Sequence, residues 1–311
     1  MVRRTRNDSF AKRRDSRSIW EARLIPGSFD YHRPTSLSDA VALLSSLDAD
    51  ARVIAGGHSL IPMMKLRLAT PSHLVDLAAV GELKGVSEVG GEIVIVAMTT
   101  QHDLIASEVL ASQLPILRET SLLIADPQVR YLGTLGGNVA NGDPGNDMPA
   151  LMMTLGAVYI LLGKAGERRV AARDYYQGAY ATAARPDEIL TKVVIAPPPA
   201  GHGYAYEKLK RKVGDYATAA AAVILTVSNG AVATCAIGLT NVADSALFAS
   251  AAAQAVIGSR MDKAALAQAS AAAEAITSPA ADGRGSSEYR RKMAGVMTAR
   301  ALSRAFARAK G

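Results

Sequence analysis

Two glycine-rich segments hold the residues of this chain that could bind a phosphorylated ligand. The first reads Ala-Gly-Gly-His-Ser at 55–59 and follows a strand-like run at 52–55. The second reads Gly-Thr-Leu-Gly-Gly-Asn at 133–138 and continues into a polar run at 141–147. Paired glycines have no Cβ, so consecutive backbone N–H groups can converge on an anion such as a pyrophosphate.

Each Gly-Gly pair is also consistent with a tight turn beside a sheet that binds nothing. Both segments, however, have side-chain donors beside their glycines, namely Ser59, Thr134 and Asn138. Two such segments from separate units could clamp a dinucleotide between them. This combination favours phosphate binding over a pair of plain turns.

Several other kinds of site are not supported by the sequence. It contains no GxGxxG fingerprint, no GxxxxGK[ST] loop, no HExxH and no GxSxG. Its histidines lie far apart, and the single cysteine, Cys235, can form neither an internal disulfide nor a multi-cysteine metal site. The sequence therefore predicts no metal site and no catalytic residue, and it suits a reducing cytoplasm.

The elements that must position the two segments are predicted as an α+β arrangement of three units. The first unit, 25–80, has a helix capped at Ser36 or Ser38 and a buried strand at 52–55. The second, 81–200, has a Gly-Gly hairpin, several helices and a glycine-rich loop before a helix that opens at Asp147 or Met148. Its strands are predicted at 85–89, 92–97, 157–162 and 189–195.

The third unit, 201–311, follows a proline-rich linker at 197–201. It has a hairpin around Asn229-Gly230, an alanine-rich helix capped near Asp262, and an amphipathic helix from about Ser286. Tyr289 is placed on the apolar face of that last helix, and Arg290 is placed off it.

The net charge of +7 is concentrated at the two ends of the chain. Residues 1–24 carry eight Lys and Arg against three acids, and residues 284–311 carry eight against one. The stretch 1–24 lacks a hydrophobic core region, so it predicts a disordered basic arm and not a signal peptide. No basic, aromatic-interleaved patch lies between the ends, so nucleic-acid binding is not expected.

The chain resembles the FAD-binding medium subunits of the molybdenum hydroxylase family, and among them those of the aerobic carbon monoxide dehydrogenases. The segments at 55–59 and 134–138 match the two flavin loops of the family. Four further runs resemble the carbon monoxide branch in particular: ETSLLIADPQVR at 119–130, ANGDPGNDMPALM at 140–152, ARDYYQGAY at 172–180 and YEKLKRKVGDYATAAAA at 206–222. The likeness covers about 25–311 and leaves out the basic arm.

This resemblance implies a vanillyl-alcohol-oxidase (PCMH)-type fold, with two FAD-binding subdomains and a C-terminal α/β domain. FAD would lie between them, held noncovalently. The resemblance places its pyrophosphate on two sets of residues: Ala55, Gly56, Gly57, His58 and Ser59, and Thr134, Leu135, Gly136, Gly137 and Asn138. His58 would shape its loop by hydrogen bonding.

Four more residues would contact the flavin portion of the cofactor. Asp147 would accept hydrogen bonds from flavin-chain hydroxyls or, as an alternative, cap the helix that follows. Leu190 would meet the ring edge through its backbone. Lys208 would favour the reduced, anionic flavin or, as an alternative, be one more solvated lysine. Tyr216 would cover one ring face or be an ordinary core or hairpin tyrosine.

The function implied is electron transfer, because the chain carries FAD only. Carbon monoxide would be oxidised at a molybdenum–copper cofactor in a large subunit, and electrons would reach FAD through [2Fe-2S] clusters of a small subunit. A quinone-type acceptor would take them up. The resemblance suggests a dimer of heterotrimers in the cytoplasm or at the inner face of the membrane. The alternatives are the flavin subunit of a xanthine dehydrogenase-like or other aromatic hydroxylase, a stand-alone flavoprotein oxidase, and a nucleic-acid- or membrane-surface-binding protein.

Overall fold

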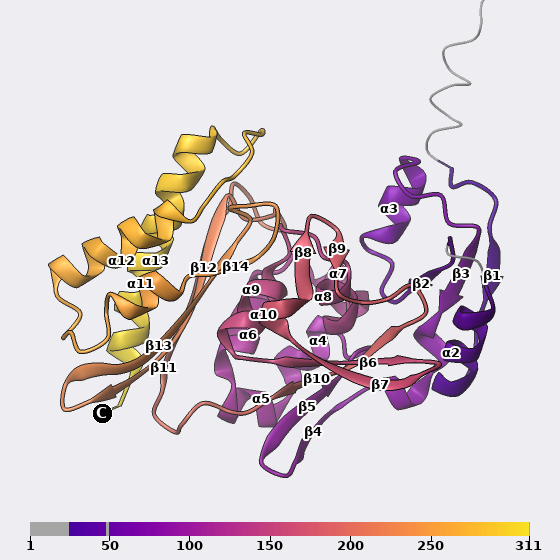
Figure 1. Cartoon of the computed structure of the whole chain (residues 1–311), viewed down its shortest axis with the longest axis horizontal. Coiled ribbons are helices and arrows are strands. Elements are labelled where there is room, and N and C mark those ends of the chain that lie inside the picture. The colour runs from indigo at the N-terminus through magenta and orange to yellow at the C-terminus, as the bar shows by residue number, and fades with distance from the viewer. Residues whose placement is uncertain (1–24, 48–49, 311) are drawn as a thin grey trace, which may run out of the picture.

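The computed structural model describes residues 25–47 and 50–310. The basic arm predicted at 1–24 lies outside these residues. The described chain is built around three main sheets with helices between and outside them (Figure 1).

The first sheet is small and entirely parallel, in the order β1-β3-β2. Its elements are β1 (Asp30–His32), α2 (Leu37–Ser46), β2 (Arg52–Ile54), α3 (Leu60–Lys65) and β3 (His73–Asp76), followed by 3-10 turns at Leu77–Ala79 and Gly81–Leu83. Ser36 caps α2, as predicted, by accepting from the Asp39 N–H. The expectation of a buried strand at 52–55 is wrong in one respect. Arg52 is exposed and the rest of β2 is only half-buried, because β2 is an edge strand.

The second sheet has five antiparallel strands in the order β4-β5-β10-β6-β7. Its strands are β4 (Val86–Val89), β5 (Glu92–Val96), β6 (Val158–Gly163), β7 (Gly166–Ala171) and β10 (Ile189–Ile195). The predicted hairpin between β4 and β5 is confirmed, with Gly90 and Gly91 both at positive φ. β7 was not predicted, because its mixed charged and apolar residues lack a clear period.

Helices fill the space between the second and third sheets and share one core with both. They are α4 (Gln101–Ala106), α5 (Glu108–Gln113), α6 (Pro115–Leu123), α7 (Pro127–Leu132), α8 (Leu135–Ala140), α9 (Asp147–Thr154) and α10 (Ala172–Tyr175), with a small ribbon of β8 (Tyr176–Gly178) and β9 (Ala181–Thr182). All residues of α9 are buried, which makes it the central helix of the molecule.

The third sheet is antiparallel, in the order β11-β12-β13-β14. Its elements are β11 (Gly203–Leu209), β12 (Ala219–Ser228), β13 (Ala231–Thr240) and β14 (Leu247–Phe248), with α11 (Ser250–Gln254), α12 (Lys263–Ala275) and α13 (Ser287–Arg308). The Asn229-Gly230 hairpin and the Asp262 and Ser286 caps are confirmed.

Small residues let helices approach both faces of this third sheet. α13 packs against β11 and β12, while α9 packs against β12 and β13 from the opposite side (Figure 1). A Cβ at Gly203 would lie 2.0 Å from the Ala305 carbonyl oxygen, and one at Gly238 would lie 2.3 Å from that of Ala150. The alanines at 219–222 are fully buried for the same reason.

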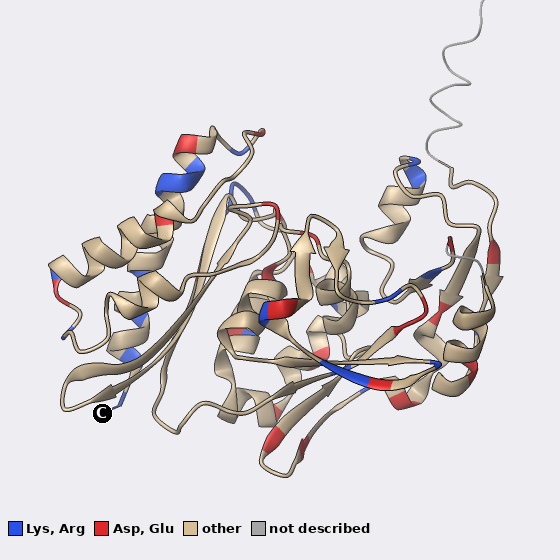
Figure 2. Cartoon of the chain, viewed as in Figure 1, with Lys and Arg blue, Asp and Glu red and all other residues tan. Residues whose placement is uncertain are grey.

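The placement of arginine on the last helix is corrected by the structure. Figure 2 shows Lys and Arg recurring along α13, but Arg290 is buried while Tyr289 is 45% exposed. The Arg290 guanidinium donates to the carbonyls of Thr218, Ala280 and Asn241. Helical periodicity could not show this, because those acceptors come from distant segments.

Candidate cofactor-binding site

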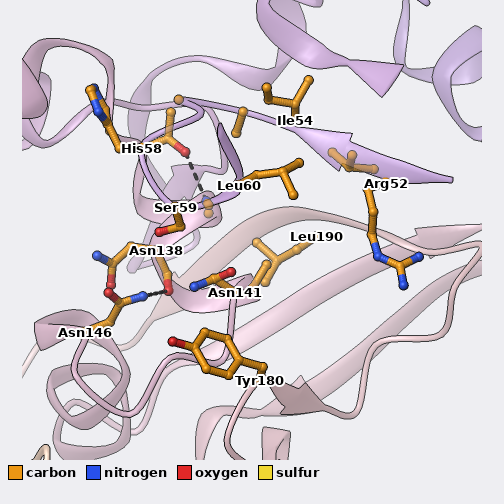
Figure 3. A pocket seen from close by; sticks show the side chains of 18 of the residues that line it. Arg52, Ile54, His58, Ser59, Leu60, Asn138, Asn141, Asn146, Tyr180 and Leu190 are labelled. Atoms are coloured by element: carbon orange, nitrogen blue, oxygen red, sulfur yellow. Dashed lines mark hydrogen bonds between the residues drawn. The ribbon is translucent and has the colours of Figure 1, made fainter. Parts of the chain in front are cut away.

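A cleft of about 1030 Å³ is lined by residues of all three main sheets, among them Arg52, Leu190 and Lys208. Figure 3 shows part of this lining from close by. Its volume is at the upper end of the range of about 300–1,000 Å³ for small-molecule sites. Every residue predicted to bind the cofactor lines it, except Gly57 and Leu135. Those that line it are Ala55, Gly56, His58, Ser59, Thr134, Gly136, Gly137, Asn138, Asp147, Leu190, Lys208 and Tyr216.

The two glycine-rich segments meet directly at this cleft. A Cβ on Gly56 would lie 2.9 Å from the Gly133 Cα and 2.2 Å from the carbonyl oxygen of Leu132, the residue before the second segment. A Cβ on Gly137 would lie 3.3 Å from the Ala55 Cβ and 2.9 Å from Thr134 Oγ1 of its own segment. Gly56 is therefore required by the close approach of the second segment, and Gly137 is constrained both by the first segment and by the Thr134 cap. Gly57 needs its glycine for a different reason, since its φ of +72° is in the left-handed region.

The second segment is the start of a helix and not the predicted loop. Thr134 caps α8, and its hydroxyl oxygen accepts from the Gly137 N–H at 3.0 Å. The Leu135 and Gly136 N–H groups donate to the carbonyls of Thr99 and Ala97, and the Asn138 N–H donates to Thr134. The expectation that these N–H groups point at an anion is thus wrong, because each has a partner in the protein.

The first segment keeps its N–H groups for a ligand. Within the described chain, the backbone N–H groups of Gly56, Gly57, His58 and Ser59 donate to no protein acceptor. The Ser59 hydroxyl precedes α3 without a capping bond. His58 is exposed, and its ring makes no hydrogen bond to any described residue, so the expected loop-shaping bond is not formed.

Side-chain amides of the second unit also lack partners where they border the cleft. Among the described residues, the buried atoms Asn138 Oδ1, Asn141 Nδ2 and Gln101 Nε2 have no hydrogen-bond partner. Buried polar groups normally have one, so these atoms indicate a polar ligand. Asn146 donates to the Asn138 carbonyl at 2.7 Å and fixes the segment (Figure 3). Gln101 and Asn141 were missed, since an isolated amide gives no pattern in a sequence.

A buried ion pair forms the wall of the cleft that the third sheet supplies. Lys208 Nζ lies 2.7 Å from Asp147 Oδ2, with side-chain exposures of 1% and 6%. The interpretation of Lys208 as a solvated lysine is therefore wrong. Asp147 does not cap α9 either, because Asn146 occupies the cap position. A further residue, Tyr206, donates its hydroxyl to Asp147 Oδ1 at 2.5 Å and was not singled out from the sequence.

Tyrosines flank the open side of the cleft. Tyr216 is 42% exposed, so it is not a core residue, but it does lie in the connection of the antiparallel pair β11 and β12, as the hairpin alternative expects. Its hydroxyl donates to Asp143 Oδ2 at 3.3 Å, and burial and then the Asp143 charge raise its pKa above the usual value. Tyr180 lines the same opening and was also missed as a site residue. Leu190 lies in β10 and is buried in the wall.

Neither a metal site nor a membrane-spanning helix is found in the part of the chain that the structure describes. No group of three or more His, Cys, Asp or Glu side chains there could hold a metal ion. No described helix is both long and apolar enough to cross a membrane. The arrangement is instead suited to an extended ligand with an anionic part at 56–59 and polar groups near Asn138 and Asp147. These features fit FAD.

Comparison with known proteins identifies the class. Residues 27–198 match the FAD binding domain in molybdopterin dehydrogenase, and residues 204–305 match the CO dehydrogenase flavoprotein C-terminal domain. The chain therefore belongs to the FAD-binding medium subunits of the molybdenum hydroxylase family. It is an oxidoreductase subunit with the PCMH-type fold predicted above.

Relatives within this family match this chain over nearly their whole length. The carbon monoxide dehydrogenase medium chain of Afipia carboxidovorans is 67% identical, covering 92% of this chain and 100% of the relative. That of Hydrogenophaga pseudoflava is 47% identical, covering 92% and 99%. A solved Cu,Mo-CO dehydrogenase chain superposes with a TM-score of 0.91 at 67% identity, over 92% of this chain and 100% of that one.

Proposed function

We propose that this chain is the FAD-binding electron-transfer subunit of an aerobic carbon monoxide dehydrogenase. The identity of 67% to a carbon monoxide dehydrogenase medium chain, over the full length of that relative, carries the proposal. Carbon monoxide would be oxidised to CO2 in a large molybdenum–copper subunit. A small subunit with [2Fe-2S] clusters would deliver the electrons, and the assembly would be a dimer of heterotrimers.

Different residues of the chain would hold different parts of noncovalently bound FAD. The free N–H groups of Gly56 to Ser59, together with the Ser59 hydroxyl, would take the pyrophosphate. Asn138 would offer its buried amide oxygen to a ligand donor, and Asp147 would accept from flavin-chain hydroxyls. Gly56 and Gly137 place no Cβ atom where the two glycine-rich segments meet, at the floor of the cleft.

The flavin end would lie between the third unit and β10. Lys208 would place a positive charge at the flavin and stabilise negative charge on it. Leu190 would meet the ring edge, and Tyr216 would cover one face and limit solvent access. The cofactor supplies the redox chemistry, since flavin can accept electrons singly and release a pair to a quinone-type acceptor. The complex would be cytoplasmic, either in solution or at the inner face of the membrane.

The first test is the flavin content of the purified full chain. We expect it to bind added FAD with flavin absorbance that survives gel filtration and is released by acid, as a noncovalent cofactor would be. A chain that binds no FAD, alone or with its partner subunits, would refute the proposal.

The second test addresses the substrate of the assembled complex. A structural relative, quinoline 2-oxidoreductase from Pseudomonas putida 86, is 36% identical with a TM-score of 0.86, so aromatic hydroxylation is the alternative. Flavin reduction in the complex should follow addition of carbon monoxide and not of purines, quinoline or aldehydes. Reduction by an aromatic substrate alone would assign the chain to the alternative.

A further inference from the structure

Tyr206 has a contact network that the proposed roles of the site residues do not use. It lies on β11, is 1% exposed, and its hydroxyl donates to Asp147 Oδ1 at 2.5 Å. Its backbone N–H donates to Glu119 Oε1 on α6 at 2.7 Å. Tyr206 is thus fixed from both ends, although it does not line the cleft.

The hydrogen-bonding groups of Asp147 and Lys208 that remain free for a ligand indicate the role of Tyr206. Lys208 has three N–H donors, and two are used, on Asp147 Oδ2 at 2.7 Å and on the Leu123 carbonyl at 3.3 Å. One donor is left for the cleft. Asp147 gives one oxygen to Lys208 and the other to Tyr206, and further lone pairs remain for a ligand. The orientation of the Asp147 carboxylate therefore determines where the free Lys208 N–H and the free Asp147 lone pairs point.

Tyr206 is a donor at any ordinary pH. Burial, and next the charge of Asp147, raise the pKa of its hydroxyl well above the usual value, so it stays protonated. A buried hydroxyl that donates to a carboxylate forms a strong, directional, charge-assisted bond. Without it, one oxygen of Asp147 would be buried with no donor, and the carboxylate could turn toward Lys208.

We propose that Tyr206 is a positioning residue for the cofactor: it orients Asp147, and through Asp147 it aims Lys208 at the flavin. The inference rests on the proposed FAD-binding function. Glu119 is the second part of the arrangement. It receives Arg304 and Arg308 from α13, and it fixes the β11 backbone that carries both Tyr206 and Lys208. The last turns of α13 are thereby linked to the flavin end of the cleft.

The test is FAD titration of the full chain carrying Tyr206→Phe. This change removes only the hydroxyl, and the Kd for FAD should rise about tenfold, as expected for one hydrogen bond to a charged group. Tyr159→Phe is the matched control. Tyr159 is also fully buried and also lies outside the cleft lining, but its 2.7 Å hydroxyl bond is to Tyr176, which does not line the cleft, whereas Tyr206 bonds to Asp147, which does. Its Kd should stay at the wild-type value.

A double-mutant cycle separates positioning from a general loss of stability. In an Asp147→Ala background, Tyr206→Phe should change the Kd by less than about twofold, because the group it positions is gone. The midpoint potential of bound FAD should also shift in Tyr206→Phe and not in Tyr159→Phe. Equal effects of Tyr206→Phe in both backgrounds, or an unshifted potential, would overturn the inference. Failure of the wild-type chain to bind FAD would instead refute the proposed function.

A second pair of variants serves if Tyr206→Phe does not fold. Glu119→Gln keeps an acceptor for the Tyr206 N–H, whereas Glu119→Ala removes it, and both lose the charge that pairs with Arg304 and Arg308. The Kd for FAD should be several-fold higher in Glu119→Ala than in Glu119→Gln. Equal values would show that fixing the β11 backbone does not affect the cofactor, and the inference would fail.

Discussion

Replacing Gly56 by alanine should force apart the two segments that form the floor of the cleft. A Cβ at this position would lie 2.2 Å from the Leu132 carbonyl oxygen, 2.8 Å from its carbonyl carbon and 2.9 Å from the Gly133 Cα. Ordinary contact begins at 3.4 Å, so the nearest atom would have to move by about 1.2 Å. All three neighbours are backbone atoms, so no rotamer change can relieve the clash.

The size of the effect follows from the cost of overpacking, about 1–3 kcal/mol. We expect Gly56→Ala to lower the free energy of unfolding by that amount in urea denaturation of the FAD-free chain. We expect weaker FAD binding as well, because the displaced segment carries the free N–H groups. Gly81→Ala is the matched control, since position 81 is exposed, has an ordinary φ and has no atom within 4 Å of a Cβ. Equal urea midpoints and equal FAD affinities for the two variants would refute the described contact.

Three further predictions concern charged groups. Lys208→Met should lower the free energy of unfolding by about 3–5 kcal/mol in urea denaturation, because it leaves Asp147 as a buried charge without its partner; an unchanged midpoint would contradict the pair. Arg290→Met should cost about 3 kcal/mol in thermal denaturation, since the carbonyls of Thr218, Ala280 and Asn241 lose their donor and Asp282 loses an ion-pair partner, whereas the exposed Arg291→Met should stay within about 0.5 kcal/mol. Burial raises the pKa of Glu119, but hydrogen bonds from Arg304, Tyr206 and Arg308 outweigh it and lower the pKa below 4.5. The stability that Glu119 adds is therefore present above pH 4.5 and lost as the pH falls through the lower folded value, so Glu119→Gln should lose less stability between pH 5 and 3 than the wild type.

Local signals in the sequence gave the elements that depend on neighbouring residues. The hairpins at Gly90-Gly91 and Asn229-Gly230 form because those residues tolerate positive φ. The caps at Ser36 and Asp262 form because the side chain needs only the next turn of backbone. β11 was not predicted, because its place in the sheet depends on pairing with β12 and on the close approach of α13 at Gly203.

The sequence predicted which residues form the candidate site better than it predicted how those residues act. Residue types and resemblance brought together the two glycine segments, Asp147 and Lys208, all of which the structure places at one cleft. What sequence could not show is where each hydrogen bond goes. The N–H groups at 135–138 face Ala97, Thr99 and Thr134 and not a ligand, and this depends on the contact of α8 with segments far along the chain.

The two glycine-rich segments, at 55–59 and 133–138, consequently differ in rigidity before any cofactor binds. Residues 135–138 are bonded to the protein already, so this segment is a preformed surface. Residues 56–59 have N–H groups that only water or a ligand can satisfy. Amide hydrogen exchange should therefore be slow at 135–138 with or without FAD, and fast at 56–59 until FAD is added. Binding of FAD would therefore order residues 56–59 against residues 135–138, which are already fixed.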